Sequence, residues 1–312
     1  MKYRNSTIPD VVFINTERVE LLRLPASTFL KEAKHLISAI QNNPADKRSF
    51  PIAKTQAFMD RIRGSKLKPS PSDKADIRIV FHDSRTLPNS NVGFSIKSQH
   101  GGSSLLLNDC DATAFTYRVE GYDFSDEEID EINTIDTPTM VIDRINAINS
   151  RSAQLVFDKV DNETFRSNLQ MMDVDMARLI AYLLLEQFKT GNRLLSDLTT
   201  DLATDNPLGY EAEDLQSIYA YKLKHLLTSA ALGMMPSKPW TGQYDANGGY
   251  LVVKKDGEIL CNHFYNHNRF EDFIFHNAYL ERAKTRRQGY GIVYRAEDGK
   301  VYFKLNLQIR LK

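Results

Sequence analysis

Asp76 and Lys97 are two residues whose types and spacing can carry out chemistry together. Asp76 begins the candidate strand "ADIRIVFHD", and Lys97 lies in the candidate strand "VGFSIKSQ" that follows a turn-rich segment. If the strands pair, the carboxylate and the ammonium meet across the sheet. Phosphodiester hydrolysis needs such a pair, because a carboxylate holds a divalent cation while a lysine orients water or stabilises charge on the phosphate. A cross-strand ion pair with only structural meaning is the alternative.

The face of the second strand that carries Lys97 is polar. Residues alternate along an extended chain, so Ser95, Lys97 and Gln99 point one way, while Phe94 and Ile96 point the other. A lysine is rarely buried without a partner. Lys97 therefore either reaches solvent at a sheet edge or has an anion nearby.

The loop "SQHGGSS" directly follows this strand. Paired glycines let the backbone approach a ligand closely, and His100, Ser103 and Ser104 offer hydrogen-bond donors to phosphate oxygens. No lysine follows the glycines at the spacing of a P-loop. A plain turn is the alternative interpretation.

The C-terminal segment "KVYFKLNLQIRLK" alternates apolar and polar residues, and its polar face contains no acid. Amide and guanidinium groups, here Asn306, Gln308 and Arg310, can pair with base edges, and lysines suit phosphates. Arg286 and Arg287 in "ERAKTRRQGYG" add a basic cluster. This pattern favours nucleic-acid contact about as strongly as it favours a solvated strand.

The positioning elements follow from periodicity and turn signals. We expect helices over residues 26–43, 55–64, 137–150 and 214–235, a helix opened by a capping box of Ser125 and Glu128, and one long core helix over residues 168–188. Hairpins are expected to turn at Asp256-Gly257 and at Asp298-Gly299. The pattern predicts an α/β or α+β fold with a mixed sheet.

This pattern predicts four regions within one compact unit. They are an N-terminal helical region (1–70), a hairpin with its following loop (71–120), a helical region (121–235) and a C-terminal β-rich region (236–312).

Composition excludes several classes of protein. The 312 residues are 42% hydrophobic and 26% charged, which is typical of a globular protein and not of a disordered or fibrous one. The two cysteines are too few for a disulfide framework or a structural zinc site. No apolar run approaches the roughly 20 residues that span a bilayer, and no signal peptide is visible, so we expect a cytoplasmic protein without a membrane contact.

Charge is distributed unevenly along the chain. Residues 121–214 carry a net charge of −13, whereas residues 1–120 carry +6 and residues 254–312 carry +5. If the two basic segments share a face, they form a field suited to a polyanion. Simple solvation of the surface is the alternative.

Four stretches in this order, "SDKADIRIVFHD", "GFSIKSQHGGSSLLLN", "ALGMMPSKPWTGQYDANGGYLVVKKDGEILCNHFYN" and "KLNLQIR", resemble the HpaII-type restriction endonucleases. The resemblance covers residues from about 50 to the end. It implies a PD-(D/E)XK-like nuclease core, with a mixed central sheet flanked by helices. It further implies a type II enzyme that requires Mg²⁺ and cuts double-stranded DNA within a short palindrome, with CCGG as the expected site.

Carried over to this chain, the resemblance implies that Asp76 binds the metal and that Lys97 is the lysine of the core motif. Ser95 stands where that motif usually has a second acid, so Ser95 and Gln99 become supporting residues. Other acids could replace the missing one. The candidates are Asp83, Glu17, Glu20, Asp109 and Asp111.

Cutting both strands of a palindrome usually takes two active sites related by a twofold axis, so we expect a homodimer on DNA. A sequence-specific DNA-binding protein that has lost cleavage is the competing hypothesis. A protein with a basic face and no nucleic-acid role is a third.

Overall fold

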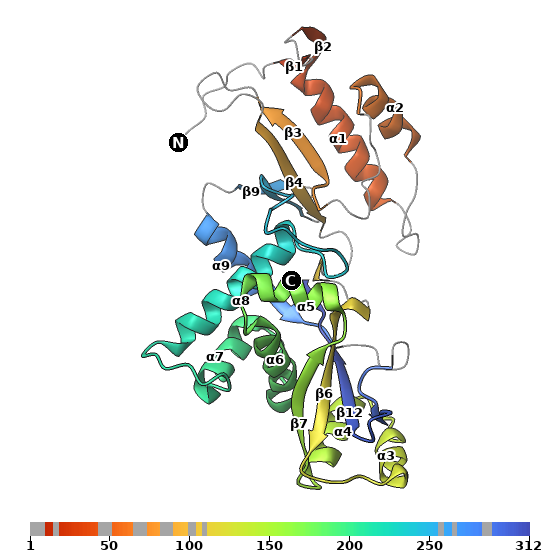
Figure 1. Cartoon of the computed structure of the whole chain (residues 1–312). Helices are drawn as coiled ribbons and strands as arrows, with labels where there is room; N and C mark the ends of the chain where they lie inside the picture. The colour runs from red at the N-terminus through yellow and green to blue at the C-terminus, as the bar shows by residue number, and fades with distance from the viewer. Residues whose placement is uncertain are drawn as a thin grey trace. The chain divides into compact units, whose positions relative to one another are not determined.

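The computed structural model describes residues 10–14, 19–42, 52–64, 74–81, 90–98, 104–107, 111–254, 259–263, 267–282 and 289–312 (Figure 1). These residues form both helices and strands, which agrees with the predicted α/β or α+β class. The chain divides into two compact units. The first contains residues 1–73, 98–101 and 253–259, and the second contains residues 74–97, 102–252 and 260–312.

The first unit combines a strand pair with two helices. Strand β1 (Asp10–Ile14) pairs antiparallel with β2 (Glu20–Pro25), and α1 (Ala26–Gln41) and α2 (Ala53–Arg61) follow. The rings of Phe13 and Phe58 both contact Phe29, with centroids at 6.1 and 5.3 Å. The two predicted helices are confirmed. The strand pair was not predicted, because a short apolar run does not distinguish a strand from a helix.

One four-stranded sheet holds the strands expected to carry the catalytic pair. Its order is β3 (Ile77–Phe81), β4 (Ser90–Ser98), β8 (Gly249–Val253) and β9 (Ile259–His263). Strand β3 pairs antiparallel with β4, with Ile77 opposite Phe94. Both predicted strand pairs in this sheet are confirmed, although the Asp256-Gly257 turn lies outside the described residues.

The C-terminal segment contributes to two further sheets. Strand β12 (Val301–Asn306) lies between β11 (Val293–Arg295) and β6 (Ala114–Glu120), and β6 pairs on its other side with β7 (Gln154–Val160). Figure 1 shows β7, β6 and β12 side by side. Strand β13 (Ile309–Leu311) lies between β10 (Ala278–Leu280) and β5 (Ser104–Leu107). The hairpin at Asp298-Gly299 is confirmed by the β11–β12 pairing. The described strands therefore form several sheets, where the sequence led us to expect one central sheet.

Helices make up most of the acidic middle of the chain. They are α3 (Asp126–Asn133), α4 (Met140–Asn149), α5 (Glu163–Met172), α6 (Met176–Thr190), α7 (Leu195–Asp205), α8 (Leu215–Leu232) and, later in the chain, α9 (His267–Asn277). The single helix expected over residues 168–188 is two helices, because Asp173 after α5 has an extended backbone (φ −165°, ψ 139°). Helices α6 and α8 supply many of the fully buried leucines of the core. No helix in the described part of the chain is long and apolar enough to cross a membrane.

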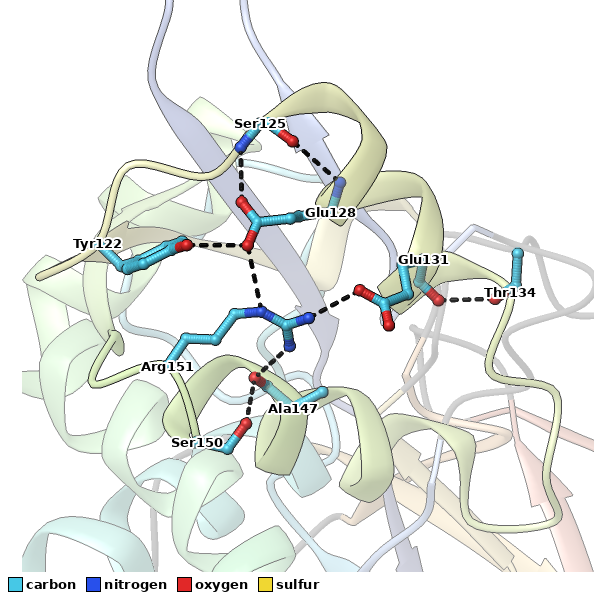
Figure 2. A network of polar contacts seen from close by, with 8 residues as sticks. All are labelled: Tyr122, Ser125, Glu128, Glu131, Thr134, Ala147, Ser150 and Arg151. Carbon is cyan, nitrogen blue, oxygen red and sulfur yellow. Dashed lines mark hydrogen bonds and ion pairs between the residues drawn. The ribbon is translucent and has the colours of Figure 1, made fainter.

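The predicted capping box at the start of α3 is confirmed (Figure 2). The Ser125 hydroxyl accepts a hydrogen bond from Glu128 N, and the Glu128 carboxylate accepts one from Ser125 N at 2.9 Å. Tyr122 donates a further hydrogen bond to the same carboxylate. These bonds lower the pKa of Glu128, the one from the Ser125 backbone most strongly.

Arg151 connects α3 to α4 (Figure 2). Its guanidinium lies 3.5 Å from Glu128 Oε1 and 2.8 Å from Glu131 Oε2 on α3. It also donates a 3.1 Å hydrogen bond to the Ala147 carbonyl in the last turn of α4. One side chain thus stabilises the packing of two helices.

Candidate active site

Asp76 lies directly before β3, and its carboxylate is held by the neighbouring strand. Its backbone N–H donates to Phe94 O at 2.8 Å, which extends the pairing of β3 with β4 by one residue. Its Oδ2 accepts hydrogen bonds from Ile96 N at 2.6 Å and from the Ser95 hydroxyl at 3.2 Å. Ser95 is buried, whereas Asp76 is exposed. The structure therefore brings Asp76 together with Ser95, whereas the strand pairing was expected to bring Asp76 to Lys97.

Lys97 lies two residues beyond Ser95 on β4 and is half-buried. Its Nζ lies 5.5 Å from the centroid of the Tyr250 ring. Burial lowers the pKa of Lys97, and the negative charge of Asp76 partly opposes that shift. Among the described residues, no carboxylate lies within ion-pair distance of this ammonium. Lys97 is therefore held near Asp76 without a direct ion pair.

Lys74 is a second cationic residue at this site. Its Nζ donates a 2.8 Å hydrogen bond to the Ala230 carbonyl in α8. The pKa of Lys74 is lowered to about 8, mainly by burial and also by the charge of Lys97, while the charge of Asp76 opposes this shift. Lys74 was not predicted as a site residue, because it ends a proline-marked basic stretch that predicts a solvated loop.

Asp245 fixes the backbone that leads into Asp76. Its Oδ2 accepts hydrogen bonds from Lys74 N at 2.8 Å and Ala75 N at 3.0 Å, and its Oδ1 pairs with Arg78. Burial alone would raise the pKa of Asp245, but these contacts outweigh burial and lower it. Both carboxylate oxygens of Asp245 therefore have partners within the protein.

The segment after Asp245 packs closely against β4. Asn247 Oδ1 accepts a 2.7 Å hydrogen bond from Gly93 N, and Gly248 N donates to Gly93 O at 2.6 Å. A Cβ on Gly93 would lie 2.3 Å from Asp245 O, so this position accepts only glycine without a shift of the backbone. The strands that carry Asp76 and Lys97 are thus positioned by one short segment.

The residues present fit a magnesium ion. Among the described residues, no group of three or more His, Cys, Asp or Glu side chains is arranged to hold a metal. Mg²⁺, however, usually keeps several waters and takes only one or two carboxylates together with substrate phosphates. Asp76 meets this need, because its Oδ1 has no hydrogen-bond partner within the described part of the chain.

Several predicted site residues lie outside the described residues. They are Gln99, His100, Ser103, Arg286 and Arg287, together with the candidate acids Glu17, Asp83 and Asp109. The backbone of Ser104 begins β5. Asp111 lies at the start of a short 3-10 helix, and Glu20 pairs with Arg23 within the first unit.

The C-terminal candidates for base contacts are largely covered. Asn306 and Gln308 are buried, and Asn306 donates a 3.1 Å hydrogen bond to the Thr113 hydroxyl. Arg310 is half-buried and pairs with Glu281. The apolar face of the segment lies in the core, as its alternation predicts. Contact of these three side chains with DNA stays a prediction.

Comparison with known proteins defines the class. The family model described as HpaII restriction endonuclease matches residues 1–311. The type II restriction enzyme HpaII of Haemophilus parainfluenzae is 37% identical over 297 residues, which cover 95% of this chain and 81% of that enzyme. No solved structure gives a significant match. The chain is therefore a type II site-specific deoxyribonuclease.

Within that class, the chain belongs to the HpaII restriction endonuclease family. Its substrate is double-stranded DNA, and its activity is that of the nuclease in a restriction-modification system. Enzymes of this class generally use a divalent metal ion. The resemblance noted in the sequence is thus confirmed.

Proposed function

We propose that the chain is a Mg²⁺-dependent endonuclease with a PD-(D/E)XK-like core that cuts both DNA strands within a short palindrome, CCGG. One observation carries the assignment of the site. The Asp76 carboxylate is held by Ser95 and the Ile96 amide of the strand on which Lys97 lies. We assign metal binding to Asp76, positioning of water and phosphate to Lys97, and support to Ser95 and Gln99.

Each side chain contributes a separate part of the reaction. Mg²⁺, when bound, polarises the scissile phosphate and lowers the pKa of a coordinated water. Asp76 presents Oδ1, because Oδ2 already accepts two hydrogen bonds from β4. The Lys97 ammonium donates to a phosphate oxygen and orients a water for in-line attack. A bond then forms from the water oxygen to phosphorus as the bond from phosphorus to the leaving oxygen breaks. The attacking water gives its proton to solvent, and the leaving oxygen takes up a proton from solvent.

Electrostatics support the same assignment. Lys97 and Lys74 both lie close enough to Asp76 for its charge to affect them. Two cations beside one carboxylate favour binding of a phosphate group, which carries negative charge that becomes concentrated during in-line attack. If Asp76 and Lys97 had only a structural role, Lys74 would not be needed beside them.

Digestion of an unmethylated plasmid tests the function. We expect discrete fragments with Mg²⁺, none with EDTA, and ends that map to CCGG. Replacing Lys97 with Ala should abolish cutting while duplex DNA is still bound. Lys159→Ala changes an exposed strand lysine and serves as the matched control. If the unmodified protein binds its site but never cuts, it is a binding protein with a degenerate nuclease site. Cutting by K97A at the unmodified rate would contradict the assigned role of Lys97.

Two sites are needed for a double-strand cut, so we propose a homodimer on DNA, acting in the cytoplasm. Sedimentation velocity with a single-site duplex distinguishes one chain per duplex from two. A complex with one chain per duplex that still cuts both strands in a single encounter would contradict the dimer.

A further inference from the structure

Tyr250 on β8 lies beside the strand that carries Lys97. The face of its ring receives the Lys97 ammonium, with Nζ 5.5 Å from the centroid. The residue is only 1% exposed, and its ring meets the Phe270 ring edge-on at 5.3 Å and 86°. Lys97, which has no carboxylate within ion-pair distance among the described residues, therefore lies against a buried aromatic face.

The hydroxyl of Tyr250 fixes the ring from the other end. It donates a 3.0 Å hydrogen bond to the Ala231 carbonyl, one residue after the Ala230 carbonyl that accepts from Lys74. Carbonyls in the last turn of a helix lack intrahelical partners and carry partial negative charge. The end of α8 is thus bonded to two residues of the site, one of which contacts Lys97.

The segment before Tyr250 strengthens the connection. Ala246 N donates a 2.8 Å hydrogen bond to Leu232 O, so the segment between α8 and β8 is bonded to the last residue of that helix. Asn247 then bonds to Gly93 on β4, four residues before Lys97. The relative placement of α8, β8 and β4 is therefore fixed on both sides of the aromatic ring.

From these contacts we infer that Tyr250 is a positioning residue, which holds the Lys97 ammonium at the reacting phosphate through the face of its ring. The inference rests on the proposed role of Lys97. A flexible lysine samples many rotamers, and ordering it in advance removes that cost from the reaction. The ring attracts the cation without neutralising it, whereas a carboxylate partner would compete with the phosphate.

Substitution of the ring tests the inference in the full-length protein. Tyr250→Leu removes the aromatic face, and misplacement of a catalytic group by about 1 Å costs on the order of 100-fold. We expect a loss of that order in kcat, with an unchanged dissociation constant for the cognate duplex. Tyr250→Phe keeps the ring but loses the bond to Ala231 O, so its loss should be smaller. Tyr221→Leu changes an exposed tyrosine and should leave the rate unchanged.

A spectroscopic measurement separates positioning from folding. In protein labelled with ¹³C at lysine Cε, the ring current of Tyr250 shifts the Lys97 methylene signals upfield. K97M assigns those signals by their disappearance. The shift should persist in Y250F and vanish in Y250L, while the other lysine signals stay in place and report an intact fold.

The outcomes are distinct. Cutting by K97A at the unmodified rate overturns the assigned role of Lys97 and the inference with it, whereas absence of any Mg²⁺-dependent cutting by the unmodified protein overturns the proposed function. If K97A is inactive but Y250L keeps the full rate, or if the Lys97 signals are the same in Y250L as in the unmodified protein, the inference alone is overturned. Displacement of many lysine signals in Y250L would show that Tyr250 maintains the fold and does not specifically position Lys97.

Discussion

The backbone amide of Ile96 donates a 2.6 Å hydrogen bond to Oδ2 of Asp76. The carboxylate is therefore oriented mainly by the main chain of the adjacent strand. The Ser95 hydroxyl adds a second hydrogen bond to a position that the pairing of β3 with β4 already determines. Under the proposed function, this relationship explains how Asp76 is aligned to bind a metal although Ser95 stands where a second acid is expected.

Ser95 and Asp76 should differ sharply in their effect on cleavage. Ser95→Ala removes one 3.2 Å hydrogen bond but leaves the Ile96 bond, so we expect less than about a tenfold loss of rate. Asp76→Asn removes the charge that attracts a divalent cation, and we expect no detectable cutting. Single-turnover cleavage of a cognate duplex over a Mg²⁺ titration measures both.

The Mg²⁺ concentration at half-maximal cleavage rate serves as the control. This concentration should be nearly unchanged in S95A if Asp76 supplies the carboxylate that binds the metal. A shift of the S95A midpoint to much higher Mg²⁺ would instead make Ser95 a direct ligand.

Lys74 makes folding stability depend on alkaline pH. Its pKa is about 8 in the folded protein and 10.5 in an unfolded chain. Between these values the unfolded state holds the extra proton, so the free energy of unfolding rises with pH. Below pH 8 both states are protonated, and the full cost of burying the charge is present.

Comparison of Lys74→Met with the unmodified protein isolates this effect. Methionine cannot titrate, so the free energy of unfolding of the unmodified protein should rise relative to the variant by on the order of 3 kcal/mol from about pH 7 to pH 11. Urea unfolding at a series of pH values gives the difference directly. A difference that stays constant with pH would mean that Lys74 is not desolvated.

Arg151 should contribute measurably to stability. Its guanidinium contacts Glu128, Glu131 and the Ala147 carbonyl, so Arg151→Met should lower the free energy of unfolding by about 1–2 kcal/mol (Figure 2). Among the described residues, Arg166 pairs only with side chains of its own helix, so Arg166→Met is the matched control, with an expected cost much smaller than that of Arg151→Met. Equal costs for the two variants would show that the link between α3 and α4 adds nothing.

Local patterns predicted most of the elements that position the site. Alternation and turn residues identified β3 and β4, and the antiparallel register that places Asp76 beside Ser95 follows from their pairing. The capping box of Ser125 and the turn at Asp298 were equally visible, because each depends on neighbouring residues. Such features are fixed by local backbone geometry.

Contacts between residues distant in sequence could not be predicted. Asp245 bonds to Lys74 and Ala75 about 170 residues away, and no spacing rule connects them. The C-terminal segment illustrates the same limit. Perfect alternation predicted one strand, but β12 pairs with β6 and β13 with β5, so the polar residue Gln308 between them is buried. Sheet membership depends on tertiary packing, which alternation does not encode.

Arg310 provides a direct test of the C-terminal segment as a DNA-binding element. It pairs with Glu281, so contact with a phosphate would have to compete with that carboxylate. If Arg310 contacts DNA, Arg310→Ala should weaken binding and reduce the salt dependence by about one ion, whereas Glu281→Gln should strengthen binding. In the double variant R310A/E281Q, the substitution at Glu281 should no longer change the affinity for DNA. Fluorescence anisotropy across a salt series measures all three, and unchanged affinity in R310A would remove Arg310 from the interface.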